Sequence, residues 1–393
     1  MSSVLISGAS IAGPALAYWL RRYGFDVTVV EKAGTPRGGG YPIDVRGTAL
    51  DVVERMGLLP ELRAAHIDGR RITFLDPEGG PVASIRPEVL TGSVDGRDLE
   101  VPRGDLTQAL YGAVRDDVEF LFNDSITTLD DHAGGVDVTF RSGARRTFDL
   151  VVGADGLHSG VRALVFGPEE QFHHYLGYCF AGFTMPNDFG LSHEGVVWNT
   201  PGRAAIRYAV GDSDELHGFL NFARPEPPFD AFRDPAAQRE LVASVFAGED
   251  WAVIPRMVEA MRTADDLFFD VVSQIHLPRW SAGRVALVGD AAHAPSFLSG
   301  QGSSLALVGA YMLAGALATA GDHTSAFAAY EQDTRPFVEL NQALVTGGGA
   351  TLLPTTAEAL DQRNAALRDF TSLPADTGRP AYTALRLPDF TNV

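Results

Sequence analysis

Short apolar runs without alternating polar positions recur along the chain and predict buried parallel strands. Ser3–Ser7 is the first run, and Asp26–Glu31, which is rich in valine, is the second. Between them, residues 13–23 have helical spacing of apolar positions, Pro14 stands where a first-turn proline is tolerated, and Gly24 ends the pattern. The opening of the chain therefore predicts strand, helix and strand, a βαβ unit.

Later stretches repeat these patterns and add a third. Residues 149–153 and 285–288 are further short apolar runs, and 103–114 predicts another helix. Residues 205–210 and 218–222 instead alternate and are rich in aromatic side chains, as expected for strands of a different sheet. The patterns therefore predict an α/β chain with a second, strand-rich region inserted between parallel strands.

Composition and charge limit the possible partners and compartment. The 393 residues suffice for two domains, and a net charge of −19 repels nucleic-acid phosphates. The single cysteine, Cys179, fits the reducing cytoplasm. Residues 305–320 carry no charge but are shorter than the ~20 residues of a spanning helix. We therefore expect a cytoplasmic monomer or homodimer that binds no nucleic acid and has no stable membrane insertion.

The first candidate site is Gly8-x-Ser10-x-x-Gly13, between the first two predicted strands. The spacing matches a dinucleotide-binding turn with serine at the second glycine position. The first glycine permits the tight turn, the second position lets a pyrophosphate approach the backbone, and the third lets helix and strand pack closely. The following helix N-terminus offers free N–H groups to phosphates, and Glu31 ends the second strand, where a carboxylate accepts hydrogen bonds from a ribose.

The same turn has a second interpretation. Gly8-Ala-Ser10-Ile-Ala12 resembles the strand-to-helix turn that carries the nucleophile of serine hydrolases. That interpretation needs a later base and acid, for which His293 and Asp290 could be nominated. It explains neither Glu31 nor the second glycine-rich segment, so the dinucleotide interpretation is preferred.

The second candidate site starts at Gly289-Asp290, after the predicted strand 285–288, and continues to Pro295 and Gly300-Gln301-Gly302. A strand-end aspartate can accept hydrogen bonds from the ribityl hydroxyls of a flavin. The glycine-rich turn directs backbone N–H groups toward the pyrimidine side of the isoalloxazine ring, where they stabilise reduced flavin. With Asp155-Gly156 between the two sites, the sequence predicts bound FAD and oxidation chemistry.

These motifs, in this order, resemble the class A FAD-dependent aromatic monooxygenases, the group of para-hydroxybenzoate hydroxylase. Within that group the chain looks closest to the branch with tetracycline-inactivating monooxygenases. The resemblance covers most of residues 1–320, and Asp155-Gly156 matches the family's Asp-Gly signature. It implies reduction of FAD by NADPH or NADH, reaction with O₂ to a flavin C4a-hydroperoxide, and hydroxylation of an aromatic or polycyclic small molecule. No metal and no protein nucleophile are needed, so no catalytic residue is nominated.

The resemblance also assigns individual residues. Arg103 matches an arginine on FAD, Arg37 and Asp44 resemble positions near NADPH and FAD, and Arg46 lies in the same flavin-facing loop. The predicted cofactor-binding residues are Gly8, Ser10, Ile11, Ala12, Gly13, Glu31, Lys32, Arg37, Asp44, Arg46, Arg103, Asp155, Gly156, Gly289, Asp290, Pro295, Gly300, Gln301 and Gly302. The candidates for an apolar substrate-pocket wall are Phe180, Phe183, Trp198, Tyr208 and Phe222.

The expected architecture is a Rossmann-like FAD-binding domain of the glutathione-reductase type with an inserted β-sheet substrate domain. Residues 1–70, 97–170 and 268–324 are assigned to the FAD-binding domain. Residues 71–96 and 171–267 are assigned to the substrate domain, and 325–393 to a C-terminal helical segment.

Two other functions stay open. Another FAD-dependent oxidoreductase, namely a reductase, an oxidase or a halogenase, would share these motifs. A halogenase of this fold should carry Trp-x-Trp-x-x-Pro, from which Trp251-Ala-Val-Ile-Pro255 departs. A non-catalytic flavin-binding module would bind FAD without substrate-stimulated NADPH oxidation.

Overall fold

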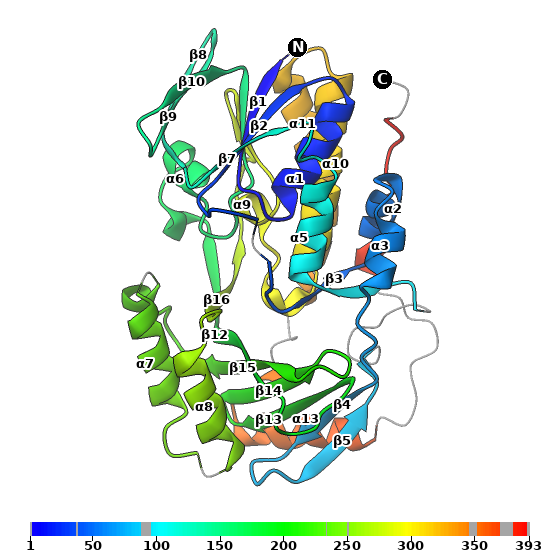
Figure 1. Cartoon of the computed structure of the whole chain (residues 1–393), viewed down its shortest axis with the longest axis vertical. Coiled ribbons are helices and arrows are strands. Elements are labelled where there is room, and N and C mark those ends of the chain that lie inside the picture. Colours follow the sequence, from blue (N-terminus) through cyan, green and yellow to red (C-terminus); the bar gives the residue numbers. More distant parts are fainter. Residues whose placement is uncertain are drawn as a thin grey trace.

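A six-stranded sheet forms the upper half of the molecule in Figure 1. The computed structural model describes residues 2–36, 38–87, 96–232, 234–249, 251–345, 352–369 and 380–390. β17 runs antiparallel to β18, and the other pairings are parallel. The strand order is β17 (Ser281–Ala282), β18 (Val285–Leu287), β11 (Leu150–Gly153), β1 (Ser3–Ser7), β2 (Asp26–Glu31) and β7 (Glu119–Phe122).

The register of the parallel strands brings their carboxyl ends to one edge of this sheet. Ser7 of β1 lies beside Gly153 of β11, which lies beside Leu287 of β18. Ligands of open α/β sheets bind outside this edge. The segments after β1, β11 and β18, which are far apart in the sequence, therefore start from neighbouring positions.

Long helices pack against this sheet (Figure 1). They include α1 (Ala12–Arg22), α10 (Gly302–Thr319) and α11 (His323–Gln342), and α10 contacts both of the others. Among the described helices, α10 alone is long and apolar enough to cross a membrane. However, 78% of its apolar window is buried inside the protein, as in the core helix of a soluble protein.

A seven-stranded sheet forms the lower half in Figure 1. Helices α7 (Pro235–Val245) and α8 (Val253–Thr263) cover one of its faces and enclose an apolar core with it. Helix α13 (Ala357–Arg368) packs on β5 and β13. The strand order is β16 (Phe268–Ile275), β12 (His173–Pro186), β15 (Glu215–Ala223), β14 (Arg203–Ala209), β13 (Glu194–Thr200), β4 (Arg71–Leu75) and β5 (Pro81–Ile85).

Smaller elements connect the two halves and shape the cavity between them. β3 (Pro42–Val45) pairs with β6 (Leu99–Pro102), which leads directly into α5 (Arg103–Gly112). A three-stranded sheet packs against β1 and β11 of the six-stranded sheet. It consists of β8 (Ile126–His132), β9 (Gly135–Phe140) and β10 (Arg145–Phe148). Further helical elements are α2 (Thr48–Arg55), α3 (Leu59–Ala64), α6 (Gly160–Val165), α9 (Asp290–His293) and the 3₁₀ turn η3 (Phe297–Ser299).

The predicted α/β class with an inserted sheet is confirmed. The predicted helix 13–23 is α1, and the predicted strands 149–153 and 285–288 are β11 and β18. The division into domains stays a prediction, but strand pairing bears on one of its boundaries. Residues 268–275, assigned to the FAD-binding segments, form β16 and pair with β12 at the edge of the seven-stranded sheet.

Candidate functional site

One cavity of about 930 Å³ lies at the carboxyl edge of the six-stranded sheet and extends to β12 and β16. It is lined by the turn after β1, the loop after β11 and the segment after β18. Gly13, Arg46, Gly289 and Gln301 do not line it, and Arg37 lies outside the described residues. The structure brings together on its wall Gly8, Ser10, Ile11, Ala12, Glu31, Lys32, Asp44, Arg103, Asp155, Gly156, Asp290, Pro295, Gly300 and Gly302.

The turn between β1 and α1 depends on glycine. Gly8 has a φ of +109°, and a Cβ there would lie 2.5 Å from the carbonyl oxygen of Ala154. A Cβ on Gly13 would lie 1.9 Å from the carbonyl oxygen of Gly8, so α1 can pack on the turn only with glycine at this position. No side chain caps α1, and Ile11 and Ala12 at its N-terminus line the cavity. The first N–H groups of the helix are therefore available to a phosphate.

Two charged side chains flank this turn. The carboxylate of Glu31 accepts hydrogen bonds from the backbone N–H groups of Ala9, at 2.8 Å, and Ala33, at 2.9 Å. Glu31 thus holds the turn in shape while it lines the cavity. A guanidinium nitrogen of Arg103 donates to Ser10 Oγ at 3.1 Å, which places a cation beside the turn. An arginine in this position can balance the charge of a pyrophosphate.

The carboxylate of Asp290 lines the cavity without a hydrogen bond or ion pair to any residue that the structure describes. Burial raises its pKa to about 6, although the charge of Arg103 opposes this shift. The side chain is half-buried, and an acceptor withdrawn from bulk water without a donor is less stable than one with a partner. The hydroxyls of a ribityl chain would supply the missing donors, so the residues present fit FAD.

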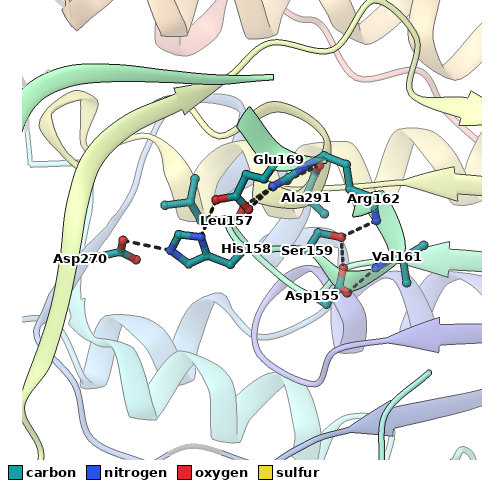
Figure 2. Close-up of polar contacts among 9 residues, drawn as sticks. All are labelled: Asp155, Leu157, His158, Ser159, Val161, Arg162, Glu169, Asp270 and Ala291. Carbon is teal, nitrogen blue, oxygen red and sulfur yellow. Dashed lines mark hydrogen bonds and ion pairs between the residues drawn. The ribbon is translucent and has the colours of Figure 1, made fainter. Parts of the chain in front are cut away.

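A polar network fixes the Asp155-Gly156 loop (Figure 2). Asp155 accepts hydrogen bonds from the Ser159 hydroxyl and, at 3.1 Å, from the backbone N–H of Val161. Ser159 also caps α6, because its Oγ accepts from the backbone N–H of Arg162 at 2.9 Å. The aspartate of the predicted signature is therefore held by the helix that follows it.

Arg162 ties this loop to the segment after β18. Its side chain is fully buried and donates to the carbonyl oxygens of Ala291, at 3.0 Å, and Leu157, at 2.6 Å. It also donates to the carboxylate of Glu169 at 2.7 Å. Because Ala291 follows Asp290 directly, one guanidinium holds two of the predicted cofactor-binding segments together.

Comparison with known proteins agrees with this geometry. The FAD binding domain family matches residues 1–344. The chain belongs to this family. A flavin-dependent monooxygenase from an unknown prokaryotic organism is 38% identical over 365 residues, which cover 92% of this chain and 94% of that protein. An uncharacterized protein of Mycobacterium tuberculosis (strain ATCC 25618 / H37Rv) is 46% identical over 361 residues, which cover 90% of this chain and 95% of that protein.

A solved structure extends the comparison to the fold. The crystal structure of the tetracycline destructase Tet(55) superposes with a TM-score of 0.85 at 35% identity, and the match covers 99% of both chains. The protein is an FAD-dependent monooxygenase, and the branch predicted from the sequence is confirmed.

The flavin-facing loop of this monooxygenase contains a buried ion pair. Arg46 Nη2 lies 2.6 Å from Asp44 Oδ1, and both side chains are largely buried. The backbone N–H of Arg46 donates to Ser304 Oγ of α10 at 3.1 Å. Asp44 lines the cavity, whereas Arg46 lies behind it. The two predicted residues thus differ in role, since only Asp44 faces the space where the cofactor would bind.

Four aromatic rings gather on the cavity wall of the monooxygenase. Tyr41, Phe180, Phe268 and Phe297 line it and contact one another. Only Phe180 of this group was predicted. The others come from the lead-in to β3, from β16 and from η3, and no local pattern marks them as neighbours.

The other predicted pocket residues do not line the cavity. Phe183, Trp198 and Phe222 belong to the apolar core under α7 and α8. Side chains alternate between the faces of a strand, so Phe180 and Phe183 point to opposite sides of β12. Tyr208 shares a smaller cluster with Phe219, and its hydroxyl donates to the carboxylate of Glu100 at 2.8 Å.

The network in Figure 2 also contains two acidic residues that the sequence analysis missed. His158 Nδ1 lies 2.7 Å from Glu169 Oε1, and its Nε2 lies 3.1 Å from Asp270 Oδ1. Asp270 belongs to β16, so this contact joins the Asp155-Gly156 loop to the seven-stranded sheet. Burial alone lowers the pKa of His158, but the hydrogen bonds and charges of Asp270 and Glu169 outweigh it and raise the pKa to about 10.

This imidazolium makes the stability of the protein depend on pH. The folded-state pKa of about 10 exceeds the unfolded value of about 6.5, so the contribution of His158 is complete below pH ~6.5 and is lost as pH rises through ~10. Urea unfolding midpoints measured from pH 6.5 to 10 should fall for the wild type and fall less for His158→Gln. If the unfolding midpoints of both proteins fell equally with pH, His158 would not be the cause of the pH dependence.

Asp290 should have opposite effects on the empty and the loaded protein. Its folded-state pKa of about 6 lies above the ordinary 3.8, so its ionisation opposes folding, and this cost is complete above pH ~6. Asp290→Asn should stabilise the apoprotein at pH 8 by up to about 3 kcal/mol and change little at pH 4. The same variant should bind FAD more weakly. Urea unfolding of apoprotein and FAD titration measure the two effects, and unchanged FAD affinity would place Asp290 outside the site.

Proposed function

We propose that the protein hydroxylates an aromatic or polycyclic small molecule, using NADPH or NADH and O₂ as co-substrates. One observation carries the proposal, namely that a single cavity joins the dinucleotide-binding turn to a cluster of aromatic rings. A hydroxylase needs both in one enclosed space, because the oxidising cofactor and the substrate ring must meet away from water.

The residues that would hold FAD occupy different parts of the cavity. The N-terminus of α1 and Arg103 provide positive charge for the pyrophosphate. Glu31 faces the expected ribose, and Asp290 offers its unpaired carboxylate to the ribityl hydroxyls. Gly300 and Gly302 lie at the N-terminus of α10, which favours negative charge. When bound, FAD supplies the two-electron redox chemistry and the activation of O₂.

The chain itself contributes orientation and exclusion of water. The apolar rings on the cavity wall position an aromatic substrate and exclude water from the faces that they cover, and the hydrogen bond from Arg162 to Ala291 fixes the loops around Asp155 and Asp290. No side chain is assigned as an acid, base or nucleophile. One oxygen atom of O₂ goes to the substrate carbon and the other leaves as water, with two electrons supplied by NAD(P)H.

The proposal is tested by spectroscopy and turnover in the same sample. The purified protein should show flavin absorbance and should oxidise NADPH faster when a substrate of the right class and O₂ are both present. The substrate panel should include tetracycline, because Tet(55) and Tet(51) are tetracycline destructases. Product should carry one oxygen atom from ¹⁸O₂ for each NADPH consumed.

The competing functions give different results in this assay. A reductase oxidises NADPH with substrate in the absence of O₂, and an oxidase forms H₂O₂ without labelled product. A halogenase requires halide for product formation. A non-catalytic module binds FAD, but none of the panel accelerates NADPH oxidation. Any of these results would overturn the hydroxylase.

The setting of the enzyme is also part of the proposal. A single cysteine and a net charge of −19 support a cytoplasmic protein that avoids nucleic acid. The burial of α10 supports the absence of stable membrane insertion. We propose a monomer or homodimer, which size-exclusion chromatography with light scattering would distinguish.

A further inference from the structure

A stacked pair of aromatic rings, Phe180 and Phe297, lies on the wall of the cavity. The ring centroids of Phe180 and Phe297 are 4.7 Å apart, and their planes differ by 15°. Phe180 is buried, whereas 36% of Phe297 is exposed, which makes it one of the few large apolar side chains exposed in the described residues. Phe297 also lines the cavity. The stack therefore ends in a ring with an accessible surface.

Two other rings stand beside this stack. Tyr41 is nearly perpendicular to Phe180 and to Phe297, with interplanar angles of 83° and 85°. Phe268 is tilted by 41° to Phe180, with its centroid 5.5 Å away. Tyr41 contacts both rings of the stack, Phe268 contacts Phe180, and among the described residues no ring other than Phe180 stacks on Phe297. A flat molecule can reach the exposed surface of Phe297 more closely than a bulky one.

The backbone holds Phe297 in this position. Ser296 has a φ of +86°, which non-glycine residues rarely adopt, and its Oγ accepts a hydrogen bond from the backbone N–H of Leu298. The hydroxyl of Ser299 donates to the carbonyl oxygen of Ser296 at 2.8 Å. Such strained positions cluster at functional sites, because the surroundings must over-determine them. The loop is also the one that carries Pro295 and Gly300, which line the cavity beside the expected flavin ring.

We propose that Phe297 determines substrate specificity by stacking on one planar, conjugated ring of the substrate, which forms a third layer over Phe297 and Phe180. The inference rests on the proposed function and narrows its substrate class to molecules with at least one flat, uncharged ring system. Offset stacking adds to the gain from burying apolar area, and a saturated ring of the same size cannot provide it. Phe297 thereby selects for planarity, while Tyr41 and Phe268 limit the lateral space.

A matched pair of probes tests the inference in the oxidised holoenzyme. 2-Naphthol and its saturated counterpart decahydro-2-naphthol share one carbon skeleton and one hydroxyl, but only the first is flat. Isothermal titration calorimetry should show tighter binding of 2-naphthol to the wild type. Phe297→Ala and Phe297→Leu should weaken 2-naphthol binding by about tenfold and change decahydro-2-naphthol binding much less. Phe297→Trp should retain the preference.

Controls separate this role from a structural one. Leu164→Ala removes another exposed apolar side chain, which belongs to α6 and does not line the cavity, and should leave both affinities unchanged. FAD content should be the same in all variants. The inference is overturned if the wild type does not bind 2-naphthol or if Phe297→Ala binds it as well as the wild type does. It is also overturned if Phe297→Ala weakens the binding of both probes equally.

The titrations involve no NAD(P)H and no turnover, so the two proposals fail separately. Phe297-dependent binding without any hydroxylated product would refute the proposed function alone. Hydroxylation by a variant that lacks the ring, with unchanged preference for flat substrates, would refute the role of Phe297 alone.

Discussion

Gly13→Ala is expected to yield a protein that neither retains FAD nor reaches wild-type stability. The added Cβ would lie 1.9 Å from the carbonyl oxygen of Gly8, a distance that real Cβ atoms do not reach, so either the turn or α1 must move. We expect a loss of about 4 kcal/mol or more in the free energy of unfolding, in the range of severe overpacking. The FAD content of the purified protein and its urea unfolding curve measure both effects.

Gly112→Ala is the matched control. Gly112 is the exposed last residue of α5, and a Cβ there would meet no atom within 4 Å. Alanine should be neutral or stabilise the helix by up to about 1 kcal/mol, because glycine is a poor helix former. If Gly13→Ala behaved like this control, the close contact between α1 and the turn would be wrong.

Arg162→Ala is expected to destabilise the protein by about 3–5 kcal/mol, because it removes a fully buried donor from two carbonyl oxygens and leaves the Glu169 carboxylate with its hydrogen bond to His158 only. It should also weaken FAD binding, since the segments around Asp155 and Asp290 lose their common contact. Arg162→Lys should recover little of the stability lost in Arg162→Ala, because an ammonium cannot reach three acceptors in the geometry of a guanidinium. Urea unfolding of the apoprotein isolates the stability effect from that of the cofactor.

Arg146→Ala provides the comparison for this variant. Arg146 also pairs with a glutamate, Glu119, but both side chains are more than 40% exposed. Exposed pairs contribute roughly 0–1 kcal/mol, so the loss should be small. Equal losses for Arg162→Ala and Arg146→Ala would show that burial of Arg162 does not matter.

The cofactor half of the protein could be predicted from its sequence because its signals are local. One short segment contains the first strand Ser3–Ser7, the glycine spacing and the second strand Asp26–Glu31. The position of each of these signals along the chain limits where the next one can lie. The same holds for Gly289-Asp290 after β18. The geometry brought these segments to one cavity, since parallel strands place their carboxyl ends together.

The substrate half could not be predicted in the same way. β12 is buried on both faces over residues 179–183, so its sequence lacks the alternation that would tell the cavity face from the core face. Phe180 and Phe183 look equivalent until α7 and α8 are known to cover one side. The pairing of His158 with Asp270, and of Arg162 with Glu169, joins positions whose proximity only the tertiary fold determines.

The order of strands in the six-stranded sheet has a consequence for how the enzyme acquires its cofactor. β1 pairs with β11, and β11 with β18, so the cavity wall is complete only after three segments from distant parts of the chain have met. Such non-local pairing makes folding slow, because each long loop must close before its contacts form. A ligand that binds only the native state shifts the folding equilibrium toward it. Cells short of flavin should therefore hold a smaller folded fraction of this chain than cells with ample FAD, because the apoprotein lacks the stabilisation that the cofactor adds.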